Sequence, residues 1–441
     1  MKRPFQNESI RQINNKFKIF VWTLFDFANT SYSIVVVTLI FAVYFKEVIA
    51  EGKPIGDFYW GLGTSVSMII TAIISPLLGA IADFSAGKKR FLLFFTLLCI
   101  ISTAMLYFTG SGSLYLALFL FIAANIGFEA GLVFYDSFLP EITTKKNYGR
   151  VSGYGFALGY FGSLAALAIT YPLIINDNIK ETFPVASLFF LIFSIPLFVF
   201  LKDSRKSVVR KESYLKIGFT RVYSTINNLR NYKNLAFFLL AFFFYIEGVN
   251  TVIYFSGNYA STTLNFSFTE LIIFFIIVQT TAIGGSVIFG ILADSIGQKR
   301  TIVISLFIWL FTIGGAYFTS YPDSFLIKLM SGLFTRDAFS LQKDSFYAVG
   351  LLAGSVMGAT QSVSRSLMSR LTPFEKKTEF FGFYSFFGKS SAILGPLVFG
   401  MVSYLTGSQR IAILTIGFFF IVGLIFLNFV KEEAEAKEQS L

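Results

Sequence analysis

The feature that most constrains this chain is a series of twelve apolar stretches separated by short polar segments. A helix needs about 20 mostly apolar residues to cross the hydrocarbon core of a bilayer. We place the spans near residues 19–45, 58–82, 91–109, 113–139, 150–175, 184–201, 234–256, 270–293, 301–319, 346–369, 381–405 and 410–430. Because 55% of the residues are apolar and only 14% are charged, we expect an all-helical membrane protein.

The positions of the basic residues predict the orientation of the chain. Of the 36 Lys and Arg residues, 27 fall in the two tails and the loops after even-numbered spans, and seven fall in the loops after odd-numbered spans. Arg365 and Lys389 lie inside predicted spans. Cytoplasmic loops carry an excess of Lys and Arg, so we expect both termini to be cytoplasmic, in a plasma or inner membrane. The net charge of +11 then indicates topology and not nucleic-acid binding.

An internal repeat divides the chain into two pseudo-symmetric halves of six helices. The residues that match are Gly79 and Asp83 with Gly290 and Asp294, 211 positions apart; Asp26, Asn29 and Thr30 with Glu247, Asn250 and Thr251, 221 apart; and Pro140, Gly149, Gly155 and Gly162 with Pro373, Gly382, Gly388 and Gly395, 233 apart. Offsets that change only across loops are typical of a duplicated unit.

The predicted organisation follows from this repeat: an N-terminal cytoplasmic tail (1–18), a first bundle (19–201), a basic cytoplasmic linker (202–233), a second bundle (234–430) and a C-terminal cytoplasmic tail (431–441). Apolar residues at helical spacing in the linker predict an amphipathic helix on the membrane surface. The change of offset from 211 to 233 requires an insertion at 320–345, to which the sequence assigns no role.

Two loops, one in each half, share a glycine and aspartate pattern. Their residues are Gly79, Asp83, Gly87 and Lys88 in the first copy, and Gly290, Asp294, Gly297 and Arg300 in the second. The glycines allow close helix approach, and the aspartate can bond a helix N-terminus or an Arg. The pattern resembles the signature loop of the major facilitator superfamily, which implies a conformational latch on the cytoplasmic side. In the first copy Gly87 follows Asp83 by four residues where three is usual.

A closer resemblance rests on motifs in both halves. They are Trp22-x-Leu24-Phe25-Asp26-Phe27-Ala28-Asn29, the segments 134–140 and 149–153, Glu247-Gly248-Val249, Gln361-Ser362-Val363-Ser364-Arg365-Ser366, and Glu379-Phe380-Phe381-Gly382 with Gly388-Lys389. They resemble the little-characterised major facilitator family that includes the autophagy-related vacuole effluxers. The resemblance implies a secondary transporter, and the eukaryotic members are associated with amino-acid release from vacuoles. Glu247 stands where Asp is more usual.

Polar and ionisable residues form stripes on four predicted spans. We assign them, with Lys389, to a substrate or proton pathway: Asp26, Asn29 and Thr30; Asn125 and Glu129; Glu247 and Asn250; Gln361 and Arg365. A charge at the bilayer centre costs about 2.5–3.5 kcal/mol, so ionisable residues in a span are expected to serve a function or to be paired.

Two interpretations of these charges stay open. The carboxylates could carry protons, with Asp26 and Glu247 as first candidates, or they could be structural partners of Arg365 or Lys389. Arg365 could also clamp an anionic substrate group. Asp136, near the end of its span, is placed to pair with Arg150.

The residues that are missing narrow the function further. The chain has no His and a single Cys, and it lacks a Walker phosphate-binding loop. We therefore expect no enzyme activity, no metal and no cofactor. The expected function is secondary active transport of a small polar or anionic solute, such as an amino acid, coupled to protons, by a monomer whose halves rock. The alternatives are a lipid or amphiphile flippase and a non-transporting membrane sensor.

Overall fold

The computed structural model describes residues 4–53, 55–85, 87–202, 213–334, 337–392 and 394–432. Within these ranges the regular structure is helical, and twelve helices are long and apolar enough to cross a membrane. Helices are the expected solution, because a backbone in lipid must satisfy its hydrogen bonds within its own segment. The chain divides into two compact units, which are residues up to 227 with 373–390, and residues 228–372 with 391 onward.

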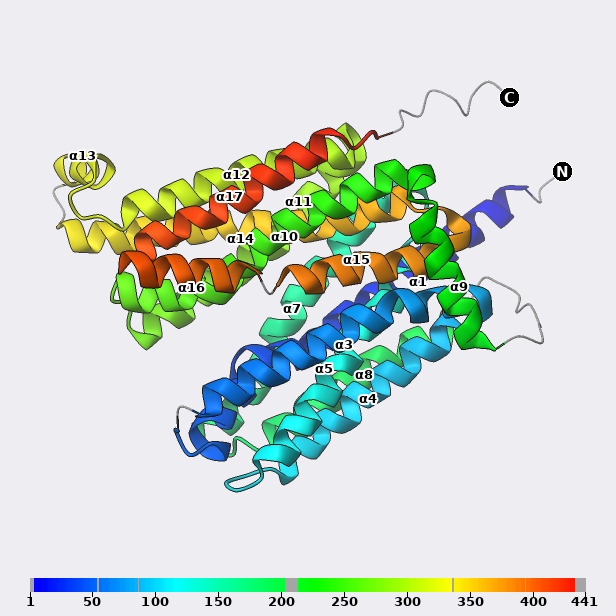
Figure 1. Ribbon diagram of the computed structural model, residues 1–441, viewed down its shortest axis with the longest axis horizontal. Helices are drawn as coiled ribbons and strands as arrows, with labels where there is room; N and C mark the ends of the chain where they lie inside the picture. The colour runs from blue at the N-terminus through cyan, green and yellow to red at the C-terminus, as the bar shows by residue number, and fades with distance from the viewer. Residues whose placement is uncertain are drawn as a thin grey trace. The chain divides into compact units, whose positions relative to one another are not determined.

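The first unit carries the first six spans (Figure 1). Its helices are α1 (Pro4–Tyr32), η1 (Ser33–Thr38), α2 (Ile40–Tyr44), η2 (Phe45–Ile49), α3 (Ile55–Ser85), α4 (Lys88–Met105), η3 (Leu106–Phe108), α5 (Leu114–Asp136), α6 (Leu139–Ile142), η4 (Lys145–Asn147), α7 (Tyr148–Ile175), α8 (Thr182–Phe200), α9 (Tyr214–Asn227), η6 (Phe374–Lys376) and α15 (Lys377–Ser391).

The second unit carries the remaining spans apart from the first part of the eleventh. Its helices are η5 (Leu229–Tyr232), α10 (Lys233–Thr263), α11 (Phe268–Ile296), α12 (Gln298–Thr319), α13 (Phe325–Phe334), α14 (Ala338–Leu371), α16 (Leu394–Thr406) and α17 (Gln409–Asn428).

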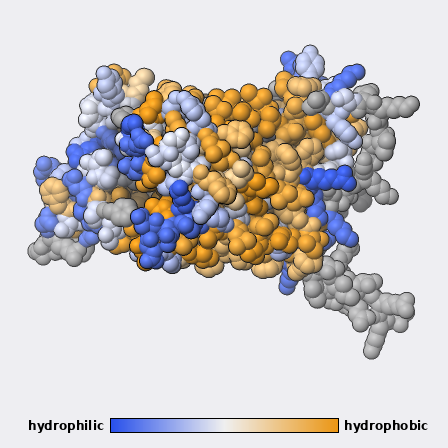
Figure 2. Space-filling model, turned by 90° about the horizontal axis from the view of Figure 1, so that it is seen from below, coloured by the Kyte–Doolittle hydropathy of each residue, from blue (hydrophilic) through white to orange (hydrophobic). Residues whose placement is uncertain are grey.

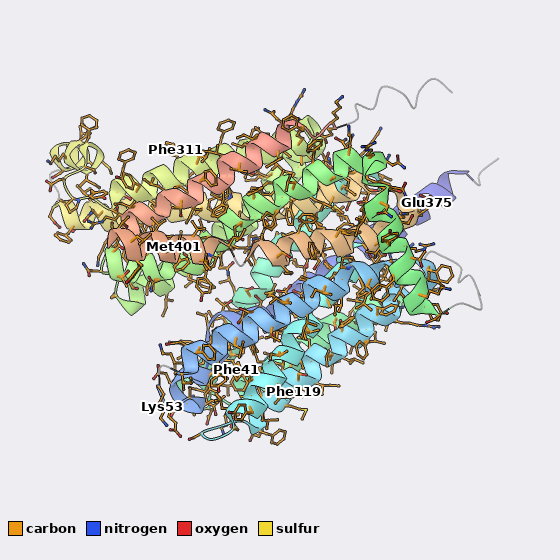
Figure 3. The ribbon with its side chains drawn as sticks, in the orientation of Figure 1. Phe41, Lys53, Phe119, Phe311, Glu375 and Met401 are labelled. Atoms are coloured by element: carbon orange, nitrogen blue, oxygen red, sulfur yellow. The ribbon has the colours of Figure 1, made fainter. Side chains whose placement is uncertain are left out.

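The surface of the bundles is apolar where lipid would cover it. Figure 2 shows a broad band of hydrophobic residues across the visible face, with hydrophilic residues gathered at both ends of the band. In Figure 3, Phe119 on α5 and Phe311 on α12 point away from their bundles, and both are exposed. Phe41 is fully buried and packs against Trp60 and Phe121. Outward apolar side chains of this kind are expected of lipid-facing positions.

Small residues bring helix backbones close together inside the first unit. A Cβ added at Gly162 on α7 would lie 2.2 Å from the carbonyl oxygen of Phe27 on α1. A Cβ added at Gly382 on α15 would lie 2.4 Å from the carbonyl oxygen of Ser75 on α3. Only glycine fits at both positions, so these glycines serve helix packing.

The eleventh predicted span is not one continuous helix. Its first part, α15, packs on α3 in the first unit, whereas its second part, α16, packs on α10 and α17 in the second unit. The helix α15 ends at Ser391 and α16 begins at Leu394. Residues 373–390, which the repeat assigns to the second bundle, therefore lie with the first unit.

The inserted segment 320–345 is largely helical. It contains α13 and the first two turns of α14, which starts at Ala338 and so precedes the predicted start at 346. Asp337 caps α14 by accepting the backbone N–H groups of Phe339 and Ser340. Hydrogen bonds from the Ser340 side chain and these two N–H groups hold the pKa of the Asp337 carboxyl below its usual value. The cap explains why the helix begins before the apolar stretch does.

The tails and the linker are described in part. Residues 4–18 are helical and continue into the first span, so the predicted tail is mostly an extension of α1. Within the linker 202–233, α9 occupies Tyr214–Asn227, and residues 203–212 lie outside the described residues. Most of the predicted C-terminal tail, residues 433–441, also lies outside them.

Candidate transport site

A hydrogen-bonded polar group links three helices of the first unit. The Asn125 amide on α5 donates to Ser67 Oγ on α3 at 2.7 Å, and its oxygen accepts a hydrogen bond from Tyr32 Oη on α1 at 3.3 Å. Glu129 lies one turn further along α5 and is 6% exposed. The predicted stripe on this span is therefore buried and faces neighbouring helices, not lipid.

Glu129 forms an ion pair with Lys389 of α15. The Lys389 side chain remains 24% exposed, whereas the Glu129 side chain is 8% exposed. The pair is therefore enclosed on the carboxylate side and accessible on the ammonium side. This contact is one of the two roles that the sequence left open for Glu129, and it joins the first unit's core to α15.

The three predicted pathway residues of α1 lie along its contact with α7. Thr30 Oγ1 donates to the carbonyl oxygen of Gly159 at 2.8 Å. Asp26 and Asn29 are buried, at 8% and 3% exposed. Within the described part of the chain, Asn29 Nδ2 has no hydrogen-bond acceptor. Buried polar groups are nearly always bonded, so this amide is an exception among the described residues; its place in a solute pathway stays a prediction.

In the second unit, Glu247 of α10 is completely buried. Its Oε1 accepts hydrogen bonds from the backbone N–H of Gly395, in the first turn of α16, and from Thr251 Oγ1 at 3.2 Å. Among the described residues Oε2 has no hydrogen-bond partner, and no cation pairs with the carboxyl group. Glu247 is thus held at a helix N-terminus, where the dipole favours negative charge, without a counter-ion.

The other predicted residues of the second unit lie on α10 and α14. Asn250 and Gln361 are half-buried, and Arg365 is 2% exposed. Ser364, beside Arg365, shares a 2.7 Å hydrogen bond with Tyr245 Oη of α10. This bond joins α10 to α14 next to Arg365, through Tyr245, which lies outside the predicted stripe of α10. Glu129 and Glu247 belong to different units.

The first signature loop holds the start of α15. Asp83, buried at the end of α3, accepts the backbone N–H of Glu379 in the first turn of α15, at 2.9 Å. A Cβ added at Gly79 would lie 2.3 Å from the carbonyl oxygen of Thr378. The aspartate thus lies at a helix N-terminus, which is one of the two contacts that the pattern allows. Its role as a latch stays a prediction.

A cluster beside this loop was not predicted. Glu141 of α6 forms ion pairs with both Lys88, from the signature loop, and Lys377, from the first turn of α15. The Lys88 and Lys377 ammonium groups also lie 3.9 and 3.8 Å from the ring centres of Phe138 and Phe374. All three charged side chains are at most 6% exposed. Glu141 follows the noted Pro140, but nothing in the spacing identifies Lys377 as its partner.

The second signature loop has a different partner. Glu432, after α17, accepts the backbone N–H groups of Gln298 and Lys299 at 2.9 and 3.1 Å and so caps α12. Gly297 adopts φ +98°, a conformation that favours glycine. Gly290 and Asp294 lie in the last two turns of α11, and Arg300 is exposed. The sequence placed Glu432 in a tail and gave no signal of this contact.

Asp136 and Arg150 lie where the sequence put them. Asp136 is the last residue of α5, Arg150 is in the first turn of α7, and both are half-buried. Gly87 precedes α4, and Lys88 is its first residue. The pairing of Asp136 with Arg150 stays a prediction.

Comparison with known proteins decides the family. A model of the family described as vacuole effluxer Atg22 like matches residues 59–440, which is most of the chain. The chain belongs to the Atg22-like family. It is 34% identical over 427 residues to the uncharacterized MFS-type transporter YxiO of Bacillus subtilis (strain 168), covering 93% of this chain and 94% of the relative. An autophagy-related protein 22 of Kluyveromyces lactis is 25% identical, with 88% and 84% covered.

Solved structures agree with this assignment at the level of fold. The proton:xylose symporter XylE matches this Atg22-like chain with a TM-score of 0.71 and 16% identity, covering 96% of this chain and 97% of the symporter. The human organic anion transporter MFSD10 matches with a TM-score of 0.70 and 14% identity, covering 94% and 99%. The Atg22-like chain is therefore a multi-pass membrane transporter of the major facilitator type and not an enzyme.

Proposed function

We propose that this protein is a proton-coupled secondary transporter of a small polar or anionic solute, with amino acids as the first class to test. The observation that carries the proposal is Glu247, a carboxyl group that is completely buried in a membrane span and has no cation partner among the described residues. An unpaired charge in this position is costly. A proton removes that cost, so Glu247 is suited to bind and release one.

Glu129 differs from Glu247 because Lys389 already neutralises it. We assign this pair to solute recognition, since the accessible Lys389 ammonium can attract a carboxylate and Glu129 an ammonium group. The unbonded amide of Asn29 adds a donor in the same unit. The matched family is described as vacuole effluxers, a description that names no solute, so the choice of solute class rests on these side chains.

Transport requires that the protein expose its sites to the two sides of the membrane in turn. We propose that the two halves rock about the polar stripes, and that the Asp83 contact with α15 breaks and reforms in each cycle. The distribution of Lys and Arg supports termini on the cytoplasmic side. A monomer contains both halves and suffices for this cycle.

The test is solute accumulation in proteoliposomes with an imposed pH gradient. Pools of amino acids and of organic anions are supplied in turn, and uptake is compared with counterflow exchange, which needs no proton gradient. We expect Glu247→Gln to lose gradient-driven accumulation and to retain exchange. The Gln amide keeps the shape of the Glu side chain but cannot bind and release a proton.

Glu47→Gln, which neutralises an exposed carboxyl group, is the matched control and should behave as wild type. Normal accumulation by Glu247→Gln would remove the coupling role of this residue.

A further inference from the structure

The helix α9 packs on the end of the first unit through a narrow face. A Cβ added at Gly218 would lie 2.8 Å from side-chain atoms of Leu77 and Ile81 of α3. Thr225 is buried and contacts Glu379 and Lys376 at the start of α15, the second at 2.8 Å. In Figure 1 the helix lies across the ends of α3 and α15. Small or polar residues thus fix α9 to the unit.

Ile217 of α9 is buried, whereas three of its other apolar or aromatic side chains are exposed. Phe219, Tyr223 and Ile226 stand at i, i+4 and i+7 on one side of the helix, and they are 64%, 68% and 47% exposed. Because removing Phe and Ile side chains from water is favourable, this stripe is expected to be covered by something apolar.

The stripe is continuous with the lipid-facing surface of α3. Ile70 and Ile73 are exposed, and Leu77 and Ile81, one and two turns further on the same face, are the residues that α9 covers. The helix α9 therefore covers the last turns of the apolar, exposed side of α3.

The charge of this region complements an anionic surface. The part of the first unit from 213 to 227 includes two basic residues, Lys216 and Arg221, and no acidic residue. Arg221 lies over the Phe84 ring at the end of α3, at 5.4 Å, and Lys216 is exposed. An exposed apolar stripe flanked by cations is typical of helices that lie in the interface of a membrane containing anionic lipid.

We propose that α9 binds the anionic lipid of the bilayer, with Phe219 and Ile226 among the upper acyl chains and the basic residues at phosphate groups. Because Thr225 contacts Glu379 next to the Asp83 contact, lipid bound by α9 stabilises the packing of α15 on α3. The lipid thereby stabilises the contact between Asp83 and Glu379, which must break in the transport cycle proposed above.

The experiment places nitroxide labels on two adjacent residues of the full-length protein. Cys99, which is buried, is first replaced by Ala, and Phe219→Cys or Thr220→Cys is added. Each protein is reconstituted in phosphatidylcholine vesicles with and without phosphatidylglycerol. Accessibility to oxygen, which partitions into lipid, is compared with accessibility to a water-soluble nickel chelate.

We expect the label at 219 to be accessible to oxygen and shielded from nickel, and the label at 220 to show the reverse. In vesicles that contain phosphatidylglycerol, the label at 219 should lie deeper in the membrane than in vesicles of phosphatidylcholine alone. Lys216→Gln should weaken the binding of α9 to the anionic surface about fivefold, so that the same phosphatidylglycerol content shifts the label at 219 less. Lys180→Gln, which removes one exposed charge from another loop of the first unit, is the matched control.

Three results would overturn the proposal. Nickel accessibility at 219 equal to that at 220 would place α9 in water, and shielding of 219 from both reagents would indicate a protein partner. A label at 219 that responds equally to both vesicle types would remove the role of anionic lipid.

Discussion

Glu141 offers the sharpest test of the packing of α15 within the first unit, because it pairs with two lysines from different segments of the chain. The three charged side chains are at most 6% exposed. The substitution Glu141→Gln keeps the shape of the side chain and removes its charge. It takes one charged partner away from each of the buried Lys88 and Lys377 ammonium groups.

The size of the effect follows from this burial. Breaking a buried ion pair by removing one partner costs about 3–5 kcal/mol. The Phe138 and Phe374 rings lower this cost, because each stabilises a lysine ammonium group through a cation–π contact worth about 0.5–2 kcal/mol. We therefore expect a loss of about 3 kcal/mol. For a unit of this size, about 2–4 °C of melting temperature corresponds to 1 kcal/mol, so the midpoint should fall by about 6–12 °C.

The chain carries its own reporter for this measurement. Cys99 is the single cysteine and is completely buried in the first unit, so a thiol-reactive dye detects unfolding of that unit on heating. Adding Lys377→Met to Glu141→Gln removes one of the two buried ammonium groups that lost the Glu141 carboxylate, and it should recover about half of the loss.

The control Glu375→Gln removes an exposed carboxyl group next to α15 (Figure 3) and should leave the midpoint unchanged. A midpoint of Glu141→Gln within about 1 °C of wild type, or a double variant less stable than the single one, would show that Glu141 does not hold these lysines.

Three further predictions follow from close contacts. Gly382→Ala should lower the same melting midpoint by an amount that corresponds to about 1–3 kcal/mol, because its Cβ would overlap the α3 backbone. Glu432→Ala should remove the cap of α12 and cost about 0.5–2 kcal/mol, seen as faster amide hydrogen exchange at Gln298, with unchanged exchange as the contrary result. Lys389→Met should lower the melting midpoint more than Lys389→Met with Glu129→Gln does, because the single change removes the counter-ion of a buried carboxylate; equal losses would contradict the pair.

The fold was largely predictable because lipid imposes a simple rule on the chain. Each run of about 20 apolar residues must become a helix, so all twelve spans were expected near their observed places. Hydropathy does not distinguish one continuous helix from two. The end of α15 at Ser391 and the start of α16 at Leu394 depend on tertiary packing, because each part packs on a different unit.

The candidate site was predictable as a set of residues and not as a set of contacts. Buried charges such as Glu129 and Glu247 are conspicuous in an apolar span, so the sequence alone identified them. Their environments depend on residues far along the chain, such as Lys389 and Gly395. Nothing in the local pattern distinguishes a carboxyl group with a counter-ion from one without.

The most direct test of the account is proton flux itself. Wild-type protein in liposomes loaded with a pH-sensitive dye should move protons across the membrane when the transported solute is added outside, and Glu247→Gln should not, although it should still exchange labelled solute. Asp26→Asn, measured beside it, shows whether the first half contributes. If Asp26→Asn and Glu247→Gln both moved protons with solute at the wild-type rate, the buried carboxyl groups would not be the coupling sites.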